Sequence, residues 1–98
     1  MQELICQAIH EKRVLDVIYH GKSRSIAPHV YGMDTTGEEM LSCYQLSGGA
    51  LGGEHAGWKS LKMRDLGAVR MTTAHFRVRP EFKENDRAMA KIFCQVSK

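Results

Sequence analysis

The sequence predicts a mostly β protein in which one N-terminal helix precedes a small, strongly bent antiparallel sheet or partly open barrel. Residues 3–12 carry apolar side chains at helical spacing, and the remainder holds short β-branched runs separated by turn residues. The 98 residues form one domain, long enough to bury about 60 to 68 per cent of the unfolded chain's surface. We assign the core to residues 4–76 and treat 77–98 as a C-terminal extension with a final strand.

The helix has one apolar stripe and ends at a basic pair, Lys12 and Arg13, beside its C-terminal dipole. The stripe consists of Leu4, Ile5, Ala8 and Ile9. We expect it to cover one side of the sheet, where it would face Leu15, Val17 and Leu41.

The strands are expected at residues 14–20, 23–31, 39–46, 58–64, 68–75 and 88–96. Pro28 cannot donate a hydrogen bond to a neighbouring strand, so its strand should lie at an edge or contain a bulge. Asp34 and Gly37 supply the chemistry of a turn. The last run also fits a short helix capped by Asn85.

A glycine cluster separates the third and fourth expected strands, with five of the nine glycines between Gly48 and Gly57. It resembles a phosphate-binding loop, but Trp58 stands where the lysine should be and a strand pattern, not a helix, follows. We therefore reject nucleotide hydrolysis and expect a long, mobile hairpin connection.

The three cysteines are Cys6, Cys43 and Cys94, an odd number with wide spacing and no C-x-x-C pair. This pattern favours neither a disulfide framework nor a zinc site and indicates a reducing compartment. No secretory signal and no membrane-length apolar run is visible, so we predict a cytoplasmic protein without a membrane partner.

Metal binding and catalysis find little support among the side chains. Cys6 and His10 share a helix face, but no second ligand pair accompanies them, and tetrahedral zinc needs three or four ligands. Cys43 and Cys94 lie in apolar strands, which is typical of inert buried cysteines. We predict no metal, no cofactor, no catalytic residue and hence no enzyme.

Positive charge is concentrated in one part of the chain. Residues 58–79 hold six lysines and arginines against Asp65 alone, a surplus of +5 in a chain of net charge +3. Alternation places Trp58, Lys62 and Arg64 on one strand face, and an aromatic platform beside cations suits single-stranded nucleic acid. Alternatively, Trp58 is a hydrophobic plug that closes one end of the barrel.

The order of several motifs resembles the WYL domain family. An apolar helix ends at Ala8 and Ile9, the next strand ends at Tyr19, and the following strand carries Arg24, Ile26 and Pro28. The stretch 59–69 is similar to a later motif of that family, so the resemblance covers about residues 4–69. It implies an Sm-like, SH3-type barrel that senses an anionic ligand, including nucleic acid, in bacterial regulators or in accessory proteins of defence systems.

The chain departs from this family at several positions. The Trp-Tyr-Leu tripeptide falls at residues 39–41, where only Leu41 matches, and the later motif has Lys59, Leu61 and Asp65 in place of Arg, Phe and Arg. Arg64 could replace the lost arginine by a shift of one residue. Because the chain begins with the family's first helix, we expect the sensing module to act alone or in a complex.

We therefore predict a regulatory or accessory module that binds a small anionic ligand or single-stranded nucleic acid. The predicted binding residues are Tyr19, Arg24, Tyr44, Trp58, Lys59, Lys62 and Arg64. The alternative is a protein interaction module that pairs an open sheet edge with a regulatory protein or with a second copy as a homodimer.

Overall fold

The computed structural model describes residues 1–48 and 56–97 of the chain. Its elements are α1 (Gln2–Glu11), β1 (Arg13–Tyr19), β2 (Lys22–Asp34), β3 (Glu39–Gly48), β4 (Gly57–Lys62), the 3₁₀ turn η2 (Met63–Asp65), β5 (Leu66–His75) and β6 (Met89–Gln95). The mobile loop that the glycine cluster predicts falls mainly on residues 49–55, which lie outside the described residues.

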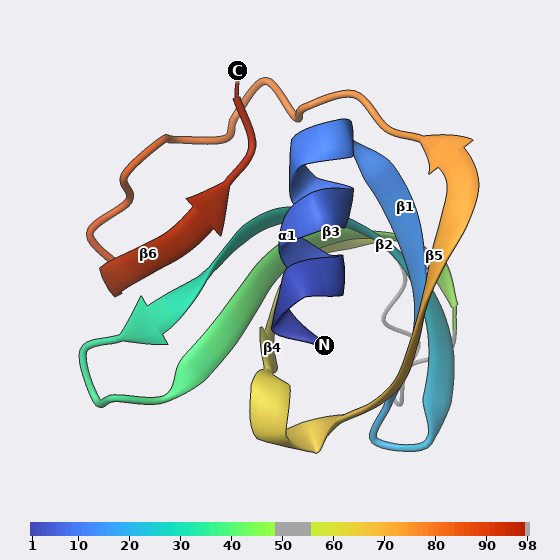
Figure 1. Cartoon of the computed structure of the whole chain (residues 1–98), viewed down its shortest axis with the longest axis horizontal. Helices are drawn as coiled ribbons and strands as arrows, with labels where there is room; N and C mark the ends of the chain where they lie inside the picture. Colours follow the sequence, from blue (N-terminus) through green and yellow to red (C-terminus); the bar gives the residue numbers. More distant parts are fainter. Residues whose placement is uncertain (49–55, 98) are drawn as a thin grey trace.

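The six strands form one curved antiparallel sheet in the order β4-β3-β2-β1-β5, and β6 pairs with the far half of β2. The sheet bends around α1 (Figure 1), and its described strands do not close into a barrel. The predicted fold class, a mostly β protein with an N-terminal helix and a bent antiparallel sheet, is confirmed. The last run is a strand, not a helix.

The face of the sheet that α1 covers, the inner face, holds the main core. Ile5, Ala8 and Ile9 are fully buried, as the apolar stripe predicts. They belong to one cluster with Leu15, Val17 and Leu41. The apolar stripe of α1 therefore anchors the helix by burying apolar surface, which is the dominant favourable term in folding.

Pro28 produces a bulge, as its missing N–H predicts. β2 pairs with β1, β3 and β6, so it is the most central strand, and its register with β3 shifts between Pro28 and Val30. A bulge places two residues opposite one on the neighbouring strand. Here Pro28 pairs with Cys43 and Val30 pairs with Ser42, so His29 is the extra residue.

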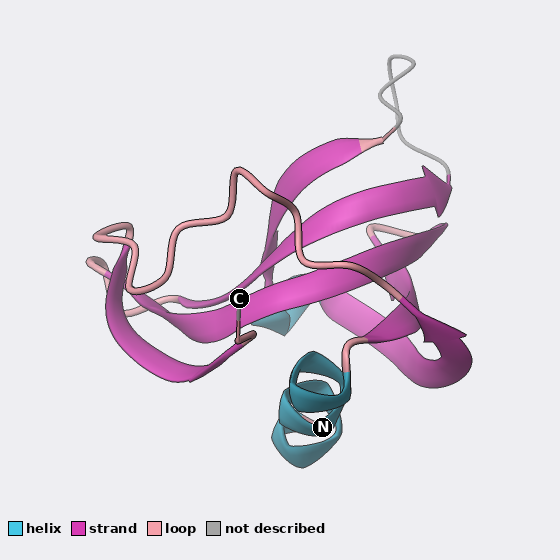
Figure 2. Cartoon of the chain, turned by 90° about the horizontal axis from the view of Figure 1, so that it is seen from above, coloured by secondary structure: helices cyan, strands magenta, loops and turns pink. Residues whose placement is uncertain are grey.

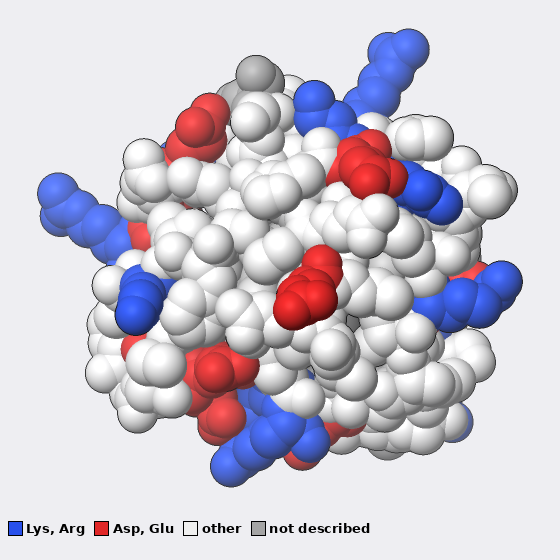
Figure 3. All heavy atoms as spheres, viewed as in Figure 1, with Lys and Arg blue, Asp and Glu red and all other residues white. Residues whose placement is uncertain are grey.

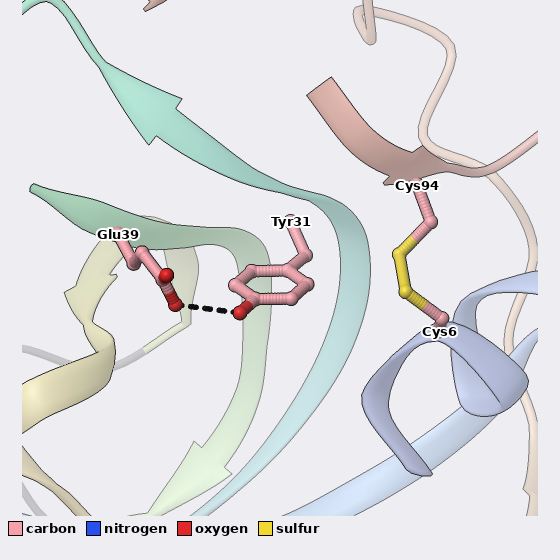
Figure 4. Close-up of a disulfide and its surroundings, with 4 residues drawn as sticks. All are labelled: Cys6, Tyr31, Glu39 and Cys94. Atoms are coloured by element: carbon pink, nitrogen blue, oxygen red, sulfur yellow. Dashed lines mark hydrogen bonds between the residues drawn. A yellow bond between two sulfur atoms is a disulfide. The ribbon is translucent and has the colours of Figure 1, made fainter. Parts of the chain in front are cut away.

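The prediction that the cysteines form no disulfide is wrong. Cys6 of α1 is bonded to Cys94 of β6 at a sequence separation of 88 (Figure 4), and Cys43 is the free, buried thiol. Cysteine counting missed the pair because it is made by the packing of β6 beside α1 and β2, not by local spacing. Next to it, Tyr31 donates a 2.6 Å hydrogen bond to the carboxylate of Glu39.

Residues 76–88, which we call the strap, run from β5 to β6 across the other side of the sheet. Figure 2 shows α1 on one side of the strands and this connection on the opposite side, the outer face. The C-terminal residues contribute Phe82, Cys94 and Val96 to the core. Among the described residues, no helix is long and apolar enough to cross a membrane.

Candidate functional site

The predicted binding residues fall into two groups on opposite faces of β3. Gln45, which contacts Arg24, and Tyr44, which contacts Trp58, are consecutive in β3, so their side chains point to opposite faces. Tyr19 and Arg24 form the first group. Tyr44 and Trp58 form the second, and Lys59, Lys62 and Arg64 are distributed around them.

The first group centres on Arg24, a half-buried arginine. Its guanidinium lies 5.1 Å from the centre of the Tyr19 ring, and its Nη1 donates a 3.3 Å hydrogen bond to the amide oxygen of Gln45. Gln45 is fully buried. The Arg24 Nε–H and the Gln45 Nε2 amide are buried without a hydrogen-bond partner among the described residues.

Arg24 also has no carboxylate partner in the part of the chain that the structure describes, unlike its neighbour Arg70, which donates a 2.7 Å bond to Asp16. Asp16 in turn accepts a 2.8 Å hydrogen bond from the Ser25 hydroxyl. Asp16 therefore interacts with Arg70 and Ser25, on the face opposite to the Arg24 side chain. Within the described residues, no carboxylate compensates the positive charge of Arg24, which is partly shielded from water.

Arg24 lines an open groove of about 520 Å³ beside the β1–β2 hairpin, which we call the hairpin groove. Its lining is made of Asp16, Val17, Ile18, Ser23, Arg24, Ser25, Ser47, Gly48, Ala68 and Arg70. The volume lies within the range of small-ligand sites. Residues alternate between the two faces of a strand, so the Arg24 side chain points away from those of Ser23 and Ser25. It lies with Tyr19 and Gln45 on one face, whereas the pair of Asp16 and Arg70 lies with Ser25 on the other.

Gly48 closes one side of the hairpin groove at a position that only glycine fits. Its φ is +124°, and a Cβ there would lie 2.5 Å from the Ser23 carbonyl oxygen and 2.6 Å from the Arg24 Cα. Both are backbone atoms, which cannot move aside as a side chain can. The absent side chain lets β3 approach β2 next to Arg24.

The second group lies on the outer face, under the strap. Tyr44 and Trp58 are cross-strand partners with ring centres 5.7 Å apart and an interplanar angle of 89°. Arg79 of the strap stacks over Tyr44 at 4.1 Å, and the Trp58 indole N–H donates a 3.0 Å bond to Glu81. Trp58 is 37% exposed, so it is neither a free platform nor a buried plug.

His29 of β2 binds the strap to the outer face of the sheet through a hydrogen bond. It is fully buried, its Nδ1 lies 2.8 Å from the Ala27 carbonyl oxygen, and its Nε2 lies 3.2 Å from the Arg79 backbone nitrogen. Because the backbone N–H must donate, Nε2 accepts and Nδ1 carries the proton. Burial lowers the pKa of His29 below its ordinary value of 6.5. Its ring contacts those of Trp58, Phe76 and Phe82.

The three remaining predicted residues do not form one basic face. The strand ends at Lys62 and a 3₁₀ turn follows, so Arg64 leaves the Trp58 face and pairs with Glu38 at 3.4 Å. The predicted alternation through Arg64 is therefore wrong. Lys62 donates its backbone N–H to the Tyr19 hydroxyl at 3.1 Å, and Lys59 is the register partner of Cys43.

Three of the six basic residues of 58–79 form ion pairs with acids elsewhere in the chain. Arg64, Arg70 and Arg79 are bound to carboxylates, those of Glu38, Asp16 and Glu81 respectively. On the face that Figure 3 shows, positive and negative side chains are interspersed and most of the positive ones stand near the rim. Local charge counting therefore overstated the free positive charge of this segment.

The described residues contain no group of three or more His, Cys, Asp or Glu that could hold a metal ion. The only free thiol among them is that of Cys43, whose pKa burial raises to about 12. A thiol with so high a pKa is a poor nucleophile at neutral pH because the thiolate is the reactive form. The arrangement is equipped for binding by hydrogen bonds, charge and ring contact.

Sequence reasoning missed Gln45, Arg70 and the serines of the hairpin groove, and also Arg79 and Phe82 of the strap. Asp16 in an apolar strand was the one available signal, because a carboxylate there needs a cation across the sheet. The strand register provides this cation, because it places Asp16 opposite Arg70 on β5 and opposite Ser25 on β2. No local pattern marks the strap residues. No family model, no curated protein and no solved structure matches this chain.

Proposed function

We propose that this chain is a regulatory or accessory binding module, and not an enzyme, that takes an anionic ligand at the Arg24 guanidinium, beside Tyr19 and Gln45. The observation that carries the proposal is the half-buried guanidinium without a carboxylate, whose Nε–H is buried and unpaired among the described residues. A buried unpaired donor costs about 1 to 3 kcal/mol, and an acceptor oxygen on a ligand would recover that cost.

The surroundings of the Arg24 side chain support the same ligand class. Tyr19 and Gln45 hold the guanidinium on one face of the sheet, and no described carboxylate pairs with it there. A phosphate or a carboxylate can use the planar donor set of an arginine in two parallel hydrogen bonds. We propose a phosphate-bearing small molecule or a nucleotide unit of a single strand as the ligand.

The resemblance to the WYL family agrees with this proposal at the level of individual positions. Tyr19 and Arg24 are two of the matched residues, and they are in contact. We propose membership of that family, with Arg24 as the ligand-binding arginine in a chain whose later motif has lost one. The cytoplasmic location stays a prediction that no longer has support from the cysteine count, because Cys6 and Cys94 are paired.

Binding of inorganic phosphate and of a labelled single-stranded oligonucleotide tests the proposal. We expect both to bind, with the log affinity for the oligonucleotide falling by about 0.7 per contacted phosphate for each unit of log salt. Arg24→Gln should weaken both by about tenfold or more, because a charge-assisted hydrogen bond is lost.

Arg77→Gln is the matched control, since Arg77 is an exposed arginine outside the hairpin groove. It should leave the affinity for phosphate nearly unchanged. Equal effects of the two substitutions, or no salt-dependent binding by a folded wild-type protein, would refute the proposal.

Self-association is the second candidate function, favoured by one observation. β4 stands at one end of the sheet order, and exposed apolar side chains lie on it and on β3, with Trp58 37% and Leu46 43% exposed. An open edge with apolar neighbours is a template for strand pairing. Light scattering over a range of protein concentrations separates the candidates, because only self-association predicts a rise in mass.

A further inference from the structure

A second hollow, the strap groove, lies between the strap and the outer face of β3 and β4, apart from the hairpin groove. Its volume is about 500 Å³, and its lining includes Val30, Ser42, Trp58, Ser60, Phe82 and Met89. Val30, Ser42 and Ser60 are register partners across β2, β3 and β4. Two of these three side chains are small, which leaves room beside the large rings.

Trp58 offers a preorganised ring to this groove. Its indole N–H is bonded to Glu81 at 3.0 Å, and Glu81 is held in turn by the Arg79 Nε at 3.1 Å. The edges of neighbouring rings, those of Tyr44 and His29, meet it from the sheet. The ring is fixed while 37% of the residue stays exposed, so it can contact a second ring without losing much rotational freedom.

The charges around the strap groove are mixed. Two lysines, Lys59 and Lys83, and two acids, Glu81 and Asp86, line it. Glu81 is paired with Arg79, whereas Asp86 accepts a 2.8 Å hydrogen bond from the Ala88 N–H and keeps its negative charge. Lys83 has no ion pair or hydrogen bond within the described residues, so its ammonium is the group that could hold an anion.

The hydroxyls of Ser42 and Ser60 complete the set of donors. Neither is engaged in a side-chain hydrogen bond to another described residue, and both line the groove. Phe82, which is buried, stacks with Trp58 at 6.5 Å and forms the floor of the apolar part. A ligand that fits has an apolar ring for the exposed part of Trp58 and an oxygen-rich end for Lys83 and the serines. We infer that the strap groove binds a small aromatic carboxylate.

Trp58 is the chain's only tryptophan, so its fluorescence reports on this groove directly. Phenylacetate is the probe, because it does not absorb where tryptophan alone is excited. We expect a saturable change of Trp58 emission in the range of about 1 mM. Cyclohexylacetate, which lacks the aromatic ring, and phenylacetamide, which lacks the charge, should each bind about tenfold more weakly.

Two substitutions and a control connect the signal to the groove. Lys83→Gln should weaken phenylacetate binding about tenfold, whereas Arg87→Gln, which removes another exposed strap cation outside the lining, should not. Ser60→Phe should fill the groove and abolish the signal. Ser60 is exposed on an edge strand, and an unchanged unfolding midpoint would show that the variant is folded.

The inference is overturned by a folded wild-type protein without saturable change, by equal binding of phenylacetate and cyclohexylacetate, or by equal effects of Lys83→Gln and Arg87→Gln. Arg24→Gln should leave phenylacetate binding unchanged. The test of this inference is therefore independent of the test of the function proposed for Arg24.

Discussion

The inner face of the sheet and the outer face under the strap differ in the kind of contact that holds each together. On the inner face, the apolar stripe of α1 packs with apolar residues from near and far along the chain, such as Leu15 and Val96. On the outer face, the buried imidazole of His29 meets the rings of Trp58 and Phe82 and a backbone N–H of the strap. The apolar periodicity of single elements predicts the inner face, whereas the outer face depends on how the strap crosses the sheet.

The comparison teaches that a few polar contacts hold the outer face, whereas buried apolar area holds the inner face. The strap is fixed by the hydrogen bond from the Arg79 N–H to His29 and by the one from Trp58 to Glu81. The inner cluster has many fully buried apolar side chains, and the disulfide joins α1 to β6 on the side of the helix. Four perturbations separate these contributions.

Breaking the disulfide should have the largest effect. Reduction, or Cys6→Ser, removes a link across a sequence separation of 88 and should lower the free energy of unfolding by about 4 kcal/mol, since the unfolded chain regains its freedom. Urea unfolding with and without a reductant measures it. The reductant should not destabilise the Cys6→Ser variant further, and identical wild-type midpoints under both conditions would contradict the prediction.

Truncating the inner core should come next. Ile9 is fully buried, so Ile9→Ala should lower the free energy of unfolding by about 2 to 4 kcal/mol through lost burial and a residual cavity. His10→Ala changes the exposed neighbour and should cost about 0.5 kcal/mol or less. If both variants unfold at the same urea concentration, α1 is peripheral to the core.

Lowering the pH should loosen the outer face through His29. Its pKa is lowered in the folded state by burial, so the unfolded state binds the proton first and stability falls as the pH drops below about 6.5. His29→Gln can still accept from the Arg79 N–H but cannot titrate. It should flatten the stability profile between about pH 7.5 and pH 5.5, and a slope equal to that of the wild type would assign the effect to other groups.

The smallest effect is expected from Glu81→Ala, which removes the acceptor of the indole N–H. The exposed carboxylate adds little to stability, but it holds the Trp58 indole, and its pKa is lowered by hydrogen bonds from its own backbone and from Arg79. We expect a near-wild-type unfolding midpoint together with a shift of Trp58 emission to longer wavelength. Glu84→Ala, on the same strap, should shift neither, and an unchanged Trp58 spectrum in Glu81→Ala would mean that the ring is held by packing alone.

Local patterns predicted the inner face well because each depends on a short stretch. The helix stripe, the strand runs and the bulge at Pro28 follow from side-chain periodicity and from one missing N–H. The 3₁₀ turn at Met63–Asp65 was missed because the sequence continues the polar and apolar alternation of β4 through these residues. The backbone changes direction there, and this removed Arg64 from the predicted face.

The candidate site was predicted only in part, for a similar reason. Of the predicted binding residues, the structure places Tyr19 against Arg24 and Tyr44 against Trp58, as two separate pairs. Their division between two faces depends on the register of β2, β3 and β4, which no single stretch of sequence contains. The partners from the strap, Arg79 and Glu81, depend on where a connection without regular structure crosses the sheet.

The Cys6–Cys94 bond also changes what a protease can do to this chain. Nearly the whole polypeptide, from the second turn of α1 to the end of β6, becomes one covalent ring. A single cut at any peptide bond within that ring opens it but releases no fragment, so the nicked molecule keeps its full mass. Only a second cut, or a reductant, would let the two pieces part.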